Sequence, residues 1–199
     1  MDLYDAGIIG AWILLIVIPL YVTRDTIMPH LALLRMGIRG IIYTPLSFLT
    51  LMVGMVLALT VAEMVPILQW GWLGANMVLA PATIITEEVT STSDPAVMAT
   101  SPVYIVSMLA VLVIAILVMI TCNYWEESRF RKRYRDVIIW ALLHILMGIP
   151  LYAVIPIFMS GNVYKYVYDK RGVCEAYCAH FFTNMTLVAI LTLALFIPV

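Results

Sequence analysis

The sequence predicts an all-α membrane protein, a polytopic bundle of about five to six helices. Its 199 residues are 64% hydrophobic and only 12% charged, with a mean hydropathy of +1.03. A soluble domain is nearer half apolar and a quarter charged. Several apolar runs approach the roughly 20 residues that a membrane-crossing helix needs, and none alternates like the strand of a membrane barrel. We therefore expect one integral membrane domain over residues 1–199.

The first expected helix runs from about Gly7 to Val22 and would remain as an anchor, because no small-residue cleavage pattern follows it. Arg24, Arg35 and Arg39 follow, and such basic segments favour the cytoplasmic side. The N-terminus would then lie outside. Within this segment, Pro29-His30 is interpreted as a turn or an interfacial stretch, with His30 wetted at the interface.

The second expected span covers about Ile41 to Val65. Residues 69–102 then form the one expected loop region, which carries only the acidic charges Glu87, Glu88 and Asp94. The absence of basic residues favours an external location. The Glu87-Glu88 pair is interpreted as solvated surface, as charge runs usually are.

A basic cluster marks the cytoplasmic end of the third expected span, about Val103 to Tyr124. Its residues are Arg129, Arg131, Lys132, Arg133 and Arg135. This is the strongest positive-inside signal of the chain, and it would also contact anionic lipid. The net charge of −1 predicts no nucleic-acid partner. We expect a multi-pass protein of the plasma membrane.

A short helix is expected over Val137–Met147, with Asp136 as its N-cap and Gly148-Ile149-Pro150 as its end. A run of about 11 residues reaches roughly 17 Å, which is too short to cross a bilayer. It would therefore be re-entrant or strongly tilted. It would form a hairpin with the next helix, about Leu151 to Tyr168, before a last helix over about Cys174–Pro198.

A pair of glutamates lies where the third apolar run meets the basic cluster, and ionisable groups at such places are costly and usually functional. Glu127 and Arg131 are i,i+4 neighbours and would form a structural ion pair. Glu126 is rotated about 100° from Glu127 on a helix. It would face the interior, where a carboxylate can act as a general base.

Further polar residues lie inside apolar helices. Trp140 and His144 share a helix face at i,i+4, and so do His180 and Asn184. A His and an Asn one turn apart suit donors aimed at one oxygen. We expect these groups to converge on the glutamate pair. The cysteines are interpreted as small apolar packing residues.

Three motifs in this order resemble the CPBP intramembrane proteases, which include CAAX prenyl endopeptidases and bacteriocin-processing proteins. The family pattern is EExxxR, then an aromatic residue and a histidine four apart, then HxxxN. It corresponds here to Glu126-Glu127…Arg131, Trp140…His144 and His180…Asn184. The resemblance covers about residues 103–199, the motif-bearing core. Trp140 stands where Phe is commoner, and the interval from Glu126 to His144 is shorter than usual.

The resemblance implies a mechanism without a cofactor. Glu126 with His144 would activate a water for attack on a peptide carbonyl, and His180 with Asn184 would stabilise the oxyanion. Glu127 and Arg131, with Trp140, would hold the architecture. The implied substrate is a membrane-associated peptide or protein, which is lipidated in one branch of the family.

Two alternatives remain open. Two glutamates and two histidines also suit zinc, which would make the protein a metal-dependent protease, although no HExxH signature is present. Alternatively, the chain is a non-catalytic membrane subunit or immunity protein that keeps the scaffold. Replacing Glu126 and removing metal with a chelator would distinguish these hypotheses.

Overall fold

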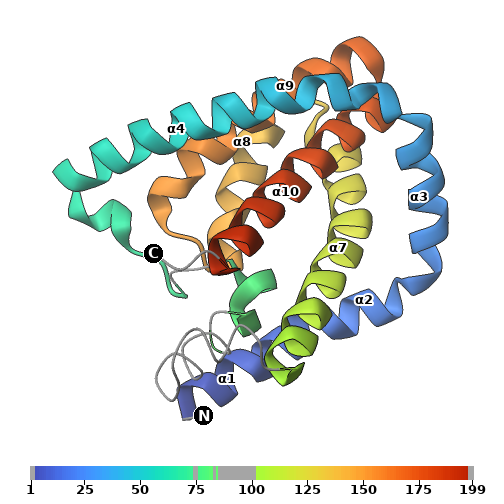
Figure 1. Ribbon diagram of the computed structural model, residues 1–199. Helices are drawn as coiled ribbons and strands as arrows, with labels where there is room; N and C mark the ends of the chain where they lie inside the picture. Colours follow the sequence, from blue (N-terminus) through green and yellow to red (C-terminus); the bar gives the residue numbers. More distant parts are fainter. Residues whose placement is uncertain (1–2, 74–75, 83, 85–101, 197–199) are drawn as a thin grey trace.

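The computed structural model describes residues 3–73, 76–82, 84 and 102–196 (Figure 1). Every regular element within these ranges is helical, as predicted. Glu87, Glu88 and Asp94, with most of the expected loop 69–102, lie outside the described residues.

Among the described residues, four helical stretches are long and apolar enough to cross a membrane. They are Asp5–Val22, Ile38–Met64, Ile105–Phe130 and Val173–Leu191. Large apolar side chains such as Leu14 and Val56 are exposed on them, as lipid-facing positions would be. These stretches confirm the expectation of transmembrane helices.

The N-terminal region contains more helix than expected. The first stretch comprises three segments in succession: α1 (Leu3–Trp12), a π-helical turn η1 (Ile13–Val17) and α2 (Ile18–Val22). After a short 3-10 turn, α3 (Ile27–Met36) contains Pro29 and His30, so the expected turn there is wrong. Pro29 lies in the first turn of α3, where its missing N–H has no intrahelical partner to lose.

His30 is also less exposed to water than expected. It is partly buried, and its ring packs on Tyr124 of α7 with ring centroids 4.6 Å apart. Burial lowers its pKa.

The second stretch consists of a 3-10 segment η3 (Ile38–Tyr43) and α4 (Thr44–Met64). Pro45 lies in the first turn of α4, where proline is tolerated. The residues described between α4 and α7 include two 3-10 turns, η4 (Pro66–Gln69) and η5 (Met77–Leu79).

α7 (Pro102–Phe130) is longer than the expected span and includes the glutamate pair in its last turns. α8 (Tyr134–Leu143) begins before the expected Val137, and a 3-10 turn η6 (His144–Met147) continues it. Asp136 is therefore not the N-cap. It lies one turn inside α8, where its carboxylate accepts the backbone N–H of Arg133 at 3.1 Å.

Two glycines reverse the chain direction on either side of α9 (Val154–Arg171). Gly148, with φ of 93°, follows η6, and Gly172, with φ of 94°, separates α9 from α10 (Val173–Phe196). Positive φ favours glycine, so these two residues permit α8, α9 and α10 to fold back on one another. A short 3-10 turn η7 (Leu151–Ala153) leads into α9.

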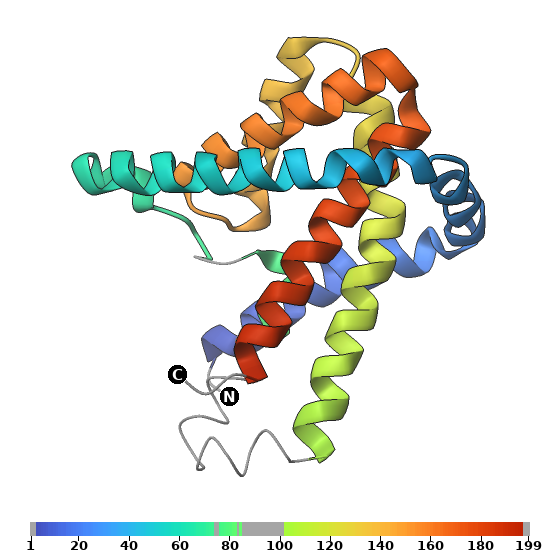
Figure 2. The same ribbon diagram turned by 45° about the horizontal axis from the view of Figure 1, so that its top comes forward.

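α10 is the central helix and contacts α3, α4, α7 and α9. Both views show α4 and α9 side by side, crossing α7 and α10 at a wide angle (Figures 1 and 2). Eight α-helices exceed the expected five to six within the described residues. The excess arises because the π-helical turn divides the first stretch and because the basic segment is itself helical.

Candidate active site

A closed ion pair lies at the C-terminal end of α7. Arg131 donates from Nε to Glu127 Oε2 at 2.9 Å and from Nη2 to Oε1 at 2.7 Å. Both side chains are 0% exposed. The expected i,i+4 pairing is confirmed by two parallel hydrogen bonds of the bidentate kind, while the buried Arg131 Nη1 has no hydrogen-bond partner among the described residues.

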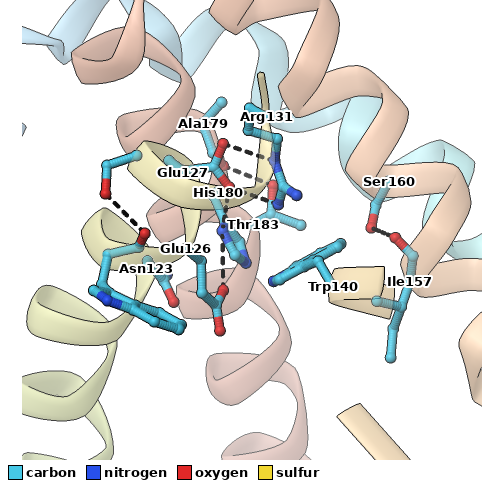
Figure 3. Close-up of polar contacts among 12 residues, drawn as sticks. Asn123, Glu126, Glu127, Arg131, Trp140, Ile157, Ser160, Ala179, His180 and Thr183 are labelled. Carbon is cyan, nitrogen blue, oxygen red and sulfur yellow. Dashed lines mark hydrogen bonds and ion pairs between the residues drawn. The ribbon is translucent and has the colours of Figure 1, made fainter. Parts of the chain in front are cut away.

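His180 of α10 extends this network. Its Nδ1 lies 2.9 Å from Glu127 Oε1 and 3.7 Å from Glu126 Oε2 (Figure 3). Because a carboxylate only accepts, the N–H of His180 is on Nδ1 and donates to Glu127. This bond occupies Nδ1, so His180 can donate to an oxyanion only through Nε2, and only when the ring is protonated.

Glu126 diverges from Glu127 as expected. Figure 3 shows its carboxylate directed away from Arg131. Its Oε1 lies 3.5 Å from the Cys122 Sγ, whose thiol is the donor, and 8% of the residue is exposed. Glu126 therefore has no guanidinium partner of the kind that holds Glu127.

His144 lies in η6, immediately after α8. Its Nδ1 lies 2.9 Å from the Trp140 carbonyl oxygen, so Nδ1 carries the proton and Nε2 keeps a lone pair. His144 is outside the four candidate spans. Burial lowers its pKa, and the negative charge of Glu126 opposes that effect. His144 is thus favoured as a neutral ring whose Nε2 can accept a proton.

The four residues expected to be catalytic meet at one cavity of about 510 Å³. Glu126 comes from α7, His144 from η6, and His180 and Asn184 from α10. The rest of the wall is largely apolar and comes from several helices, with Leu51, Met52, Met55, Val118, Met119 and Leu187 among its residues. Few of these side chains can form a hydrogen bond with a polar ligand. Hydrogen bonding is therefore concentrated at the part of the wall that carries the Glu126 carboxylate and the imidazoles of His144 and His180.

Asn184 contacts a residue that sequence reasoning missed. Its Nδ2 donates to Asn123 Oδ1 at 3.4 Å, which links α10 to α7. Asn123 is 4% exposed and also lines the cavity. A signal existed, because Asn123 is a polar residue within an apolar run one turn before Glu127.

Aromatic rings enclose the polar groups. The Trp140 ring lies 3.9 Å from the Arg131 guanidinium, and Tyr164 of α9 stacks on His180 with centroids 4.4 Å apart. Burial raises the pKa of Tyr164 to about 12, so its phenol stays neutral. Sequence reasoning missed Tyr164, because Tyr166 and Tyr168 in the same helix give no signal that separates it.

A buried lysine ties α9 to the end of α7. Lys165 Nζ donates to Asp169 at 2.8 Å and 3.0 Å and to the Arg131 carbonyl oxygen at 3.3 Å. The last bond holds the backbone of the residue whose side chain pairs with Glu127. Lys165 was also missed, since a lysine near a helix end usually reads as a solvated charge.

The zinc alternative gains no ligand set from this geometry. Within the described ranges, no group of three or more His, Cys, Asp or Glu side chains is arranged to hold a metal ion. The hypothesis of a metal-dependent enzyme is tested by measuring the metal content of the purified protein.

Comparisons of the chain with protein-family models, with curated proteins and with solved structures find no match.

Proposed function

We propose that this protein is an intramembrane endopeptidase that hydrolyses a peptide bond of a membrane-associated substrate. One observation carries the proposal: Glu126 and His144, from separate helical segments, line a single cavity with His180 and Asn184. Glu127, the neighbour of Glu126, is at the same time neutralised by Arg131. Two adjacent carboxylates with different partners are typical of a site that needs one free carboxylate.

In the proposed mechanism, Glu126 takes a proton from a water in the cavity, and the resulting nucleophile attacks the peptide carbonyl carbon. His144 Nε2 accepts a hydrogen bond from the same water and orients it. The negative charge that develops on the carbonyl oxygen is stabilised by the Asn184 amide and by a protonated His180. The tetrahedral intermediate then collapses as its C–N bond breaks, and the proton held by Glu126 passes to the leaving amine, which completes hydrolysis.

The proposed topology follows from the distribution of charge. The N-terminus would lie outside the plasma membrane, and the basic cluster from Arg129 to Arg135 would lie inside, against anionic lipid. α8 and η6 together are too short to cross, and α9 is not among the four candidate spans. We therefore treat α8 and α9 as a hairpin that enters from the cytoplasmic side and delivers His144 to the cavity.

The proposed family is that of the CPBP intramembrane proteases, supported by the three motifs and their meeting at the cavity. A lipidated substrate is implied by only one branch of that family, so the proposal does not require one. The non-catalytic alternative is supported by the dense Glu127–Arg131–His180 network, which would stabilise an inactive scaffold equally well.

The test compares Glu126→Gln with wild type in lipid vesicles. A panel of dansylated apolar peptides, lipidated and not lipidated, is incubated with each protein, and products are identified by mass spectrometry. We expect Glu126→Gln to lower the cleavage rate at least about 100-fold, as loss of a general base does. Glu63→Gln, an exposed glutamate of α4, is the matched control and should cleave like wild type.

Other outcomes would identify an alternative. If wild type cleaves no peptide and Glu126→Gln unfolds more readily, the polar groups form a structural network. If zinc co-purifies at one ion per chain and a chelator abolishes cleavage, the metal-dependent hypothesis is correct. Cleavage by Glu126→Gln at the wild-type rate would contradict the proposed role of Glu126.

A further inference from the structure

Two buried hydrogen-bond donors in the wall of the cavity lack an acceptor. The Trp140 Nε1 and the Asn123 Nδ2 have no hydrogen-bond partner in the part of the chain that the structure describes. The two residues are 3% and 4% exposed, and both line the cavity beside Glu126. Neither donor is used in the mechanism described above.

The Trp140 indole is held in place by its neighbours. One face covers the Arg131 guanidinium, and the ring packs edge-on against His144, with centroids 4.7 Å apart, and against His180, at 5.5 Å. Figure 3 shows the nitrogen edge of the indole directed toward Glu126 and His180. The ring is therefore not free to turn its N–H elsewhere.

The Asn123 amide is oriented by Asn184. Because Asn123 Oδ1 accepts the hydrogen bond from Asn184 Nδ2, the Asn123 NH₂ group is the end of the amide that remains without a partner. Asn184 thereby uses one of its own donors to position Asn123. The pair from α7 and α10 still offers N–H groups to a ligand.

Buried N–H groups without an acceptor cost free energy, and nearly all such groups in native proteins are paired. The apolar side chains that make up most of this cavity wall cannot supply an acceptor. A bound ligand can do so, and the acceptor that a peptide presents at every residue is its main-chain carbonyl oxygen.

We propose that Asn123 and Trp140 bind the substrate by donating hydrogen bonds to main-chain carbonyl oxygens adjacent to the bond that Glu126 and its water attack. The inference rests on the proposed function for the identity of the ligand. It adds two residues to the site, and it separates substrate binding by Asn123 and Trp140 from catalysis by Glu126 and His144.

The first experiment measures binding without turnover, in a Glu126→Gln background. The probe is the tightest binder of the dansylated peptide panel, and its affinity is compared for Trp140→Phe and Asn123→Leu. Phe keeps an aromatic ring and Leu keeps the branched shape, while each removes the donor. Leu also removes the Oδ1 that accepts the hydrogen bond from Asn184. We expect affinity to fall about 5- to 10-fold in each variant, as loss of one neutral hydrogen bond implies.

The matched control is Trp125→Phe, the same change at an exposed tryptophan of α7 that does not line the cavity. It should leave the affinity unchanged. Thermal stability provides a second readout: Trp140→Phe also removes indole atoms that pack on the Arg131 guanidinium and face Gly161, so some fall in melting temperature is expected whatever the N–H does. A lower melting temperature with unchanged affinity would show a structural role and overturn the proposal.

The second experiment changes the ligand. Replacing successive amides of the probe with esters weakens one carbonyl acceptor at a time. We expect one position where the ester lowers the affinity for the Glu126→Gln protein but has no further effect in Trp140→Phe, because the two changes remove the same bond.

The outcomes separate the two proposals. Peptides that bind through Asn123 and Trp140 but are never cleaved by wild type would overturn the protease function and leave the binding site standing. Cleavage by wild type, together with equal affinities for Trp140→Phe, Asn123→Leu and Trp125→Phe, would overturn only the binding inference. Failure of the whole panel to bind would also overturn it.

Discussion

At the scale of single residues, Glu126 and Glu127 are neighbours with different chemistry. A helix turns about 100° per residue, so consecutive side chains point in different directions. Glu127 faces Arg131 and His180 and forms a closed buried network. Glu126 faces the cavity. The division of roles is thus a consequence of helix geometry rather than of residue type.

Replacing Glu127 tests the structural half of this division. Glu127→Gln would leave the Arg131 guanidinium buried without its counter-charge. We expect the free energy of unfolding to fall by about 3–5 kcal/mol, as when one partner of a buried pair is removed. Unfolding in detergent, followed by circular dichroism, measures the change.

The control for Glu127→Gln is Asp25→Asn, which removes the carboxylate of an exposed ion pair with Arg24 at 3.9 Å. Exposed pairs contribute about 0–1 kcal/mol, so little change is expected. Equal effects of the two substitutions would show that the Glu127–Arg131 pair is not a stabilising element.

At the scale of elements, the packing of α8 against α9 positions Trp140 and, through it, His144. Gly161 of α9 lies directly against α8: a Cβ there would lie 2.7 Å from Trp140 Cζ3 and 3.0 Å from Val137 Cγ1. The close approach of the two helices therefore depends on the absence of a side chain at this residue. Lys165, one turn later, fixes α9 to the Arg131 backbone.

Gly161→Ala tests this contact. The added methyl must displace the Trp140 ring or separate the helices, and we expect a destabilisation of about 1–3 kcal/mol. Displacement of the indole would also change the near-ultraviolet circular dichroism and slow peptide cleavage.

Gly10→Ala in α1 is the matched control, because a Cβ there meets nothing within 4 Å. Its only effect should be a gain of up to about 1 kcal/mol from helix propensity. If Gly161→Ala behaves in the same way, the α8–α9 contact does not constrain the site.

At the scale of the whole molecule, the cavity exists because α10 packs against α7, α9 and α4, with α4 lying beside α9. Residues far apart in the chain, such as Asn123 and Asn184, meet only in this arrangement. The side of the membrane to which the cavity opens then depends on the topology.

The proposed topology predicts a labelling pattern in intact cells. In a background without native cysteines, Asp5→Cys should react with a membrane-impermeant maleimide from outside, because the N-terminus is proposed to be external. Arg35→Cys and Lys132→Cys should react only after permeabilisation. The inverse pattern would place the basic cluster outside and contradict the topology.

Much of the fold and part of the site could be predicted from the sequence, because those features are local. Apolar runs about as long as a bilayer is thick predicted the membrane helices, and i,i+4 spacing predicted the Glu127–Arg131 pair. The start of α8 at Tyr134 and the helical state of Pro29-His30 were not predicted. In both cases the prediction gave polar or helix-breaking residues more weight than the tendency of a helix to continue.

Only the tertiary structure decided which polar groups are partners. Tyr164 and Lys165 resemble ordinary residues of their helices, and the polar Asn123 gives no indication of its partner. Their contacts with His180, the Arg131 backbone and Asn184 depend on how separate helices cross. The hydrogen bond from His180 of α10 to Glu127 of α7 likewise depends on how separate helices cross. Sequence spacing therefore determined which residues share a face of each helix. Packing determined which faces meet, because that depends on side-chain volumes and glycine contacts between distant segments.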